Sequence, residues 1–175
     1  MKKIFLILLV GFIGVTSFTD NTHSYFELAN NSIKKYKPPR KDYVIVIDYS
    51  KSIFSERLYV LDMVTNKVVI SSTVSHSFKS GVLYVNKYSN QKGSNMTCGG
   101  TFITQGIKYG RFGYSMVIKG LDKGINDNSK SRSIIFHSNK KMKTKWSNGC
   151  FATPENINKE IIDLTKNGCL VYVIK

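Results

Sequence analysis

Short apolar runs, rich in β-branched and aromatic residues, dominate the hydrophobic pattern of the chain. Such runs are typical of strands that are buried on at least one face. They cover residues 43–49, 57–64, 67–74, 100–107, 114–121, 133–137 and 169–174. Glycine and asparagine clusters supply turns between them, and Thr65-Asn66 has the length and chemistry of a hairpin turn. The pattern therefore predicts a domain built mostly from antiparallel strands.

Residues 153–168 have the different pattern of an amphipathic helix. Their apolar side chains fall mostly on one stripe, formed by Ile157, Ile161, Ile162 and Leu164. A capping threonine followed by proline predicts the start of this helix, and Asn-Gly predicts its end. We therefore expect a mainly β fold, a β-rich α+β sandwich or barrel, with this one clear helix packed on the sheet.

The N-terminus has the pattern of an export signal. Lys2 and Lys3 precede an apolar run over residues 4–15, and small residues follow. This order predicts a secretory signal peptide over residues 1–17. The apolar run is shorter than the roughly 20 residues that a membrane-spanning helix needs, so no stable span is expected after cleavage. An uncleaved N-terminal anchor is the alternative. Either way, the sequence predicts export to the periplasm or cell envelope.

A polar, lysine-bearing segment follows the predicted signal. It covers residues 18–42, has room for one short helix at 25–30, and ends beside Pro38-Pro39, which breaks any helix. The folded domain is then expected over residues 43–175. The chain of 175 residues fits one such domain.

The charge balance narrows the class of partner. Lys and Arg number 26 and Asp and Glu 11, which gives a net charge of +15 and favours a polyanionic partner or surface. Most of the basic residues are lysines spread along the chain, whereas proteins that read nucleic acids rely on arginine for base contacts. For an exported protein, the sequence favours cell-wall polymer or anionic lipid over nucleic acid.

One pair of residues suggests covalent chemistry. The predicted strand 133–137 ends in His137, and Ser147-Asn148-Gly149-Cys150 comes just before the predicted helix. A cysteine at a helix N-terminus is expected to be stabilised as a thiolate, with His137 as the activating base. The amides of residues 147–150 are candidate donors to an oxyanion. The alternative is that Cys150 packs as a small hydrophobe and His137 has no chemical partner.

These residues resemble the L,D-transpeptidase family, whose YkuD-type catalytic domain carries a histidine followed by Ser-x-Gly-Cys. The murein L,D-transpeptidase subgroup is the closer match, through residues 48–51, 57–60, 76–81, 92–94, 113–115 and 120–128. The resemblance covers residues 43–175 and implies a YkuD-like β-sandwich or barrel. The chain departs from the family in the short, lysine-rich loop 138–146 and at Phe151, both beside the expected site.

The resemblance implies an enzyme that acts on peptidoglycan stem peptides without a cofactor. Cys150 is expected to attack the carbonyl before the terminal D-alanine and form a thioester. An amine from a second stem then gives a 3→3 cross-link. Hydrolysis by the same Cys-His site, as in an L,D-carboxypeptidase, and a non-catalytic basic wall-binding module are the alternatives.

Further residues are candidates for lesser roles. His76, Arg132 and Trp146 are candidates for substrate binding. The alternative for His76 and Trp146 is a packing role, and the alternative for Arg132 is a solvated position on the surface. Cys98 and Cys169 have a disulfide as one alternative and separate core packing as the other. No metal site is expected, because no close-spaced pair of ligands accompanies the histidines. The sequence leaves the oligomeric state open.

Overall fold

The computed structural model describes residues 16–175, with side chains from residue 22 onward. The helices are α1 (Thr16–Tyr36), the 3-10 helix η1 (Phe78–Ser80) and α2 (Glu155–Thr165). The strands are β1 (Tyr43–Asp48), β2 (Leu58–Asp62), β3 (Lys67–Ser72), β4 (Gly100–Gly110), β5 (Gly113–Gly120), β6 (Ile135–Ser138), β7 (Phe151–Thr153) and β8 (Leu170–Ile174). The signal peptide predicted over residues 1–17 lies almost wholly outside the described residues.

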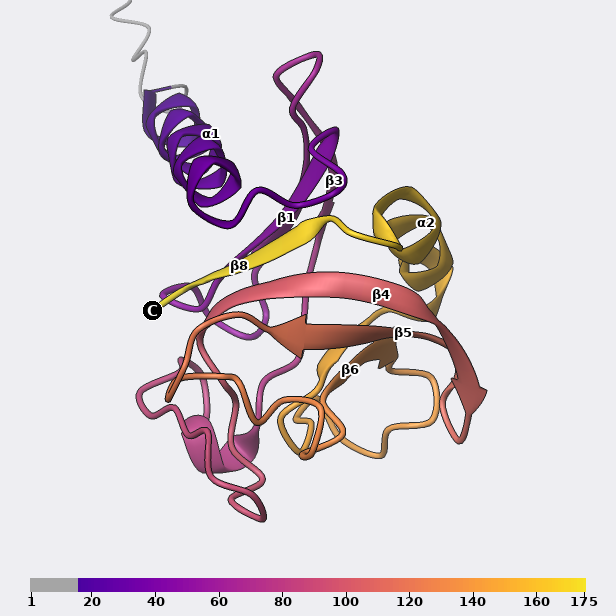
Figure 1. Cartoon of the computed structure of the whole chain (residues 1–175). Coiled ribbons are helices and arrows are strands. Elements are labelled where there is room, and N and C mark those ends of the chain that lie inside the picture. The colour runs from indigo at the N-terminus through magenta and orange to yellow at the C-terminus, as the bar shows by residue number, and fades with distance from the viewer. Residues whose placement is uncertain (1–15) are drawn as a thin grey trace, which may run out of the picture.

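The strands form one sheet in the order β3-β2-β1-β8-β4-β5-β6-β7. The sheet curls strongly, so that it resembles a nearly closed barrel (Figure 1). Its neighbours are antiparallel except for the pairs β1–β8 and β6–β7, which are parallel. The main core packs on one face and includes Ile45, Ile47, Phe102, Phe136 and Phe151, all without exposed surface. These features confirm the mainly β fold expected from the sequence.

Each strand that the hydrophobic pattern predicts is present, with small shifts at the ends. The hairpin between β2 and β3 is also confirmed, and Asn66 in its turn has φ +53°, a conformation that asparagine tolerates. The pattern does not predict β7. Its three residues, Phe151–Thr153, are too few to show a strand period, and the predicted helix start overlaps them.

Helix α1 is much longer than the short helix expected at 25–30. It has 21 residues and lies against the face of the sheet near β1 and β8 (Figure 1). Tyr25 and Ala29, one turn apart, are buried with Val44 and Val46 of β1 in a second apolar cluster. This helix therefore covers the face of β1 that points away from the main core. No helix of residues 16–175 is long and apolar enough to span a membrane.

A polar contact also fixes α1 on the sheet. The Tyr25 hydroxyl donates to Asp48 Oδ2 at 2.7 Å, and the Tyr25 ring stacks on that of Tyr59 at 5.0 Å between centroids. Burial and the neighbouring Asp48 carboxylate both raise the pKa of Tyr25 above its ordinary value. The phenol is therefore held in its neutral, donating form.

Helix α2 packs on the sheet as the apolar stripe predicts, with Ile161 and Ile162 fully buried in the main core. The predicted capping arrangement is wrong by one position. Thr153 is the last residue of β7, and Pro154 takes the N-cap position without a side-chain cap. The Thr153 hydroxyl contacts Asn158 Oδ1 at 3.1 Å instead. Pairing with β6 therefore determines the conformation of Thr153 more strongly than its capping tendency does.

Candidate active site

The parallel pairing of β6 with β7 brings the two candidate catalytic residues to one place. His137 pairs with Ala152, and Phe136 pairs with Phe151. Because side chains alternate between the two faces of a sheet, Phe136 and Phe151 enter the core. Continuing the register by one residue places Cys150 on the same face as His137. The edge of the sheet therefore carries the thiol and the imidazole on one face, with Cys150 opposite Ile135, two positions from His137.

Hydrogen bonding defines the tautomer of His137. Its Nδ1 lies 2.7 Å from the backbone oxygen of Ser138, and only an N–H donates to a carbonyl. Nδ1 therefore carries the proton, and Nε2 is left with a lone pair. Burial lowers the pKa of His137 below its ordinary value, with the Ser138 contact acting in the opposite direction. The imidazole is thus neutral at pH 7 and able to accept a proton.

The ring of Phe112 covers one face of this imidazole. The two rings stack with centroids 4.0 Å apart and planes inclined by 18°. Phe112 lies in the turn between β4 and β5, and because β5 is the direct neighbour of β6, this turn lies beside the end of β6. The stacking holds the ring of His137 in one orientation and excludes water from one of its faces.

Cys150 does not lie at a helix N-terminus, which corrects the expectation from the sequence. Strand β7 and Pro154 separate it from α2, so the helix dipole does not act on its sulfur directly. The Cys150 thiol lies 3.6 Å from the backbone oxygen of Ser133. Burial raises the pKa of the thiol above its ordinary value, although the Ile135 amide and the Arg132 charge act in the opposite direction. The resting site therefore pairs a neutral thiol with a neutral imidazole.

Ser147 organises the turn that carries the cysteine. Its amide donates to the backbone oxygen of His76 at 2.9 Å, and its hydroxyl donates to the backbone oxygen of Cys150 at 2.7 Å. The Gly149 amide in turn donates to the Ser147 hydroxyl at 3.1 Å. Within residues 16–175, the amides of Asn148 and Cys150 have no such partner. These two amides, and not that of Gly149, are available to an oxyanion.

Gly149 is required at its position by both conformation and space. Its φ is +107°, and a Cβ built there lies 2.6 Å from the backbone oxygen of Met96.

We expect Gly149→Ala to lower the free energy of unfolding by about 1–3 kcal/mol and to displace the two free amides. Chemical denaturation checks the first effect, and Cys150 acylation checks the second. Gly124→Ala is the matched control, because Gly124 has φ +77° with nothing near its Cβ. Equal losses in both variants would show that the contact with Met96 is unimportant.

In the described part of the chain, two cavities border Cys150. The first, of about 420 Å³, is called the larger cavity of the two and also borders His137. His137, Ser147, Asn148 and Cys150 line it. Residues 141–144 and Trp146 of the preceding loop line it as well. The lysine-rich loop that departs from the family pattern therefore forms a wall of the site.

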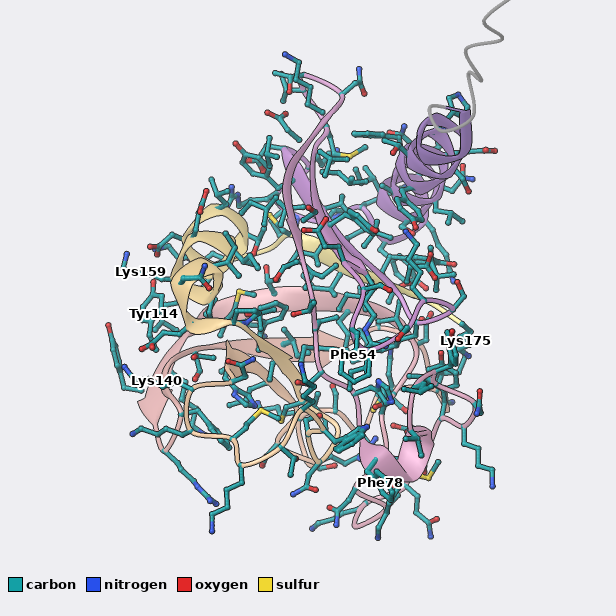
Figure 2. All side chains as sticks on the ribbon, turned by 180° about the vertical axis from the view of Figure 1, so that it is seen from behind. Phe54, Phe78, Tyr114, Lys140, Lys159 and Lys175 are labelled. Atoms are coloured by element: carbon teal, nitrogen blue, oxygen red, sulfur yellow. The ribbon has the colours of Figure 1, made fainter. Side chains whose placement is uncertain are left out.

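The structure places Trp146 in the wall of the larger cavity. Its indole Nε1 donates to the backbone oxygen of Val82 at 2.9 Å. Its ring meets that of Phe78 edge-on, with centroids 5.3 Å apart. Phe78 lies on η1 at the lower edge of the molecule in Figure 2. These contacts hold the indole in position, so that its surface is presented to the cavity.

Two residues of the site, Arg111 and Phe112, were not predicted from the sequence. Both line the larger cavity, and both line a second cavity of about 210 Å³, the smaller cavity, which also contains Cys150. They form the turn between Gly110 and Gly113, the last pair in the register of β4 with β5. An arginine and an aromatic residue at the tip of a glycine-flanked hairpin were the available signal. Only the fold brings that tip to Cys150.

Arg132, a candidate for substrate binding, is used within the protein. Its guanidinium donates to the backbone oxygens of Ser89 and Met96 and to Cys98 Sγ. These bonds connect Arg132 to the loop before β4, and both the guanidinium and the Met96 backbone oxygen lie next to Gly149. The structure therefore places Arg132 as a support of the site rather than in the lining of either cavity.

His76, the other candidate for substrate binding, is fully buried and lines neither cavity. The Arg57 guanidinium donates to its Nδ1 at 2.7 Å, so Nε2 carries the proton and donates to the backbone oxygen of Gly81 at 3.0 Å. Burial, followed by the charge of Arg57, lowers the pKa of His76 to about 4. The backbone oxygen of His76 accepts from the Ser147 amide, so the residue supports the turn that carries Cys150 through its main chain.

The lowered pKa of His76 predicts a loss of stability in acid. An unfolded histidine has a pKa of about 6.5, so the unfolded chain binds more protons than the folded chain between that pH and about 4. The free energy of unfolding is therefore expected to fall as pH drops through this window, by up to about 3 kcal/mol from this residue. Urea unfolding at pH 7 and pH 4.5 measures the loss. His76→Gln, which preserves both contacts, should reduce it, whereas His23→Gln on the exposed face of α1 should not. An unchanged loss in His76→Gln contradicts the assignment.

The other cysteines do not form the disulfide that the sequence left open. Cys98, Cys150 and Cys169 are all free thiols, and Cys98 and Cys169 are fully buried. Burial raises the pKa of Cys169 to about 11. No group of three or more His, Cys, Asp or Glu side chains among the described residues is arranged to hold a metal ion. Cys150 is thus the one accessible thiol of residues 16–175.

Comparison with known proteins gives the family and the fold. A family model described as the L,D-transpeptidase catalytic domain matches residues 18–174. The solved structure of the Ldtfm-avibactam carbamoyl enzyme is 15% identical, with a TM-score of 0.51, and the match covers 77% of this chain and 49% of that chain. A fused Zn-dependent amidase/peptidase/peptidoglycan-binding domain-containing protein from Clostridium acetobutylicum is 16% identical, with a TM-score of 0.51 and coverage of 89% and 62%.

An L,D-transpeptidase (Yku) from Stackebrandtia nassauensis is 13% identical, with a TM-score of 0.48 and coverage of 78% of this chain and 57% of that chain. The search of curated proteins gave no match. The present chain spans less than two thirds of the length of these solved structures. At such identities, the two likenesses with scores above 0.5 show a shared fold.

Proposed function

Since the chain belongs to the L,D-transpeptidase catalytic-domain family, we propose that it cross-links peptidoglycan stem peptides through a thioester on Cys150. The donor is a stem peptide that ends in D-alanine. The acceptor is an amine of a second stem, and the product is a 3→3 cross-link. The proposal places the protein in the cell envelope, in line with the predicted export signal.

The observation that carries this proposal is the larger cavity, which Cys150 and His137 line together. A substrate carbonyl in that cavity meets both the nucleophile and the base. His137 holds its proton on Nδ1, so its Nε2 is the basic atom. No acidic residue is needed as a third member, because the backbone oxygen of Ser138 orients the ring.

The acylation step follows from these groups. As Cys150 Sγ attacks the scissile carbonyl, its proton passes to His137 Nε2, so charge develops only when substrate is present. The free amides of Asn148 and Cys150 donate to the resulting oxyanion. His137 then returns the proton to the departing amine, and the C–N bond breaks. D-Alanine leaves, and the acyl group remains on Sγ.

The deacylation step reverses the roles of the same atoms. An acceptor amine attacks the thioester carbonyl and gives up one proton to His137 Nε2. The C–S bond breaks, the new amide forms, and the thiolate of Cys150 regains its proton from His137. Water in place of the amine gives a free carboxylate, which is the carboxypeptidase reaction.

Mass spectrometry of muropeptides incubated with the protein tests the proposal. We expect dimers with 3→3 linkages in the wild type and none in Cys150→Ala. Tripeptides without dimers would support the hydrolase alternative. Unchanged muropeptides, with the wild-type protein folded by circular dichroism, would contradict an enzymatic function and favour the wall-binding alternative.

A further inference from the structure

The smaller cavity lies against the same sulfur as the larger cavity, and the tip of the β4–β5 hairpin lies between them. Cys150, Arg111 and Phe112 are the residues that line both. The remaining lining of the smaller cavity is Lys108, Gly110, Ser115, Ser133 and Ile135. Cys150 therefore borders two spaces of different size, of about 420 and 210 Å³.

The lining of the smaller cavity is cationic and contains no acidic residue. Lys108 and Arg111 form no ion pair within residues 16–175, whereas other lysines of the chain do. Lys140 pairs with Glu155, and Lys159 pairs with Asp163; both lysines lie on the outside of the molecule on the side of α2 (Figure 2). The positive charges of Lys108 and Arg111 therefore have no acidic partner within residues 16–175, and an anionic ligand could bind to them.

Arg111 is also oriented rather than free in solution. Its guanidinium carbon lies over the Phe112 ring, 5.6 Å from the centroid, and that ring stacks on His137. A guanidinium presents a planar set of donors that matches a carboxylate. The stack therefore places a carboxylate-binding group next to the imidazole that protonates the leaving amine.

The size of the smaller cavity limits its occupant. At roughly 30 Å³ per water molecule in the liquid, its volume of about 210 Å³ corresponds to about seven waters. One alanine, with six non-hydrogen atoms, fits this space, whereas the rest of a stem peptide needs the larger cavity. In the proposed substrate, the terminal carboxylate belongs to the residue directly after the scissile carbonyl. It therefore lies within one residue, about 3.8 Å of backbone, of the reacting centre.

We propose that the smaller cavity is the subsite for the leaving D-amino acid, in which Arg111 and Lys108 bind its terminal carboxylate. The inference rests on the proposed function and deepens it, because it makes a free C-terminal carboxylate a requirement for the donor. Stems that are extended or amidated beyond D-alanine would leave the two cations without a partner. The cavity would then restrict the enzyme to the last peptide bond of the stem.

The first experiment measures the anion site without turnover. Iodoacetate and iodoacetamide both alkylate the Cys150 thiolate: a bond forms between Sγ and the reagent's CH2 carbon, and iodide leaves. The two reagents differ only in that the transferred group carries a carboxylate in the first and a neutral amide in the second. We expect the ratio of their rates at Cys150, followed by peptide mapping, to fall about fivefold in Arg111→Gln and in Lys108→Gln. Lys123→Gln, an exposed lysine that lines neither cavity, is the matched control and should keep the wild-type ratio. An equal ratio in all four proteins overturns the proposal.

The second experiment measures the consequence for the substrate. The wild type is given a stem tetrapeptide with a C-terminal carboxylate and the same peptide with a C-terminal carboxamide. We expect kcat/KM to be at least about tenfold higher for the carboxylate, and the preference to shrink in both cavity variants. Equal turnover of the two peptides overturns the subsite. If neither peptide reacts while the alkylation ratio still falls in both variants, the anion site is supported and the proposed function is wrong.

Discussion

Cys150→Ala is expected to abolish release of D-alanine from a stem tetrapeptide, with a fall in rate of about 10⁴-fold or more. The reason is that Cys150 is the one thiol in the lining of the two cavities. Cys98 and Cys169 are fully buried and cannot replace it. A coupled D-amino acid oxidase assay measures the released amino acid directly.

Cys169→Ala is the control for this variant, because it removes a thiol that lines neither cavity. Its activity should stay within about twofold of the wild type, with a modest loss of stability from the lost packing. Release of D-alanine by Cys150→Ala at more than about 1% of the wild-type rate would mean that a different nucleophile operates.

The second large effect is expected for His137→Gln, which should lower kcat/KM by about 10²–10⁴-fold. Glutamine retains a donor to the Ser138 backbone oxygen but has no basic atom in place of Nε2. The fall should therefore come with normal folding and with a normal mass of the acyl-enzyme at long times. His23→Gln, on the exposed face of α1, should have no effect on the rate.

The dependence of kcat/KM on pH tests the same role of His137. Burial lowers the pKa of His137 below that of an ordinary histidine, so the neutral, basic form already predominates at pH 6.5. For the wild type, kcat/KM is expected to rise with pH through a value lower than that of an ordinary histidine and then to level off. The variant should lose this acid limb. An acid limb centred above 6.5, or one retained in His137→Gln, would contradict the role of His137.

The strands were predictable because the sequence has a strong local signal for them. The run 43–49 and the hairpin around Thr65-Asn66 combine β-branched residues with suitable turn residues, and both are confirmed. The pair of His137 with Ser147–Cys150 was likewise visible, because it forms a short pattern in the chain. The structure brings these residues to one cavity.

Helix α1 was only partly predictable, because its apolar stripe is narrow. Among its side chains from residue 22 onward, Tyr25 and Ala29 are the buried apolar ones, and polar residues such as Ser24, Glu27 and Asn30 interrupt the apolar positions around them. Its stability comes from tertiary contact with the face of β1 and from the bond to Asp48. Such contacts are not visible in a local pattern, and so the segment appeared to be mostly irregular.

The electrostatic state of Cys150 was predicted wrongly for a related reason. Thr153-Pro154 looks like the start of a helix, which would place the sulfur near its positive end. Pairing of Phe151–Thr153 with β6 moves the start of α2 to Glu155 and leaves the thiol under the influence of burial. The role of Arg111 and Phe112 was missed because only the long β4–β5 hairpin carries them to the site.

Acylation of Cys150 by a stem peptide is the step on which the proposed function depends, and intact-protein mass spectrometry of reactions quenched in acid during turnover detects it. We expect an added mass equal to the donor tetrapeptide minus D-alanine, located by peptide mapping on Cys150 and removed by hydroxylamine. Product formation without that adduct, or with the adduct on any other residue, would contradict the account.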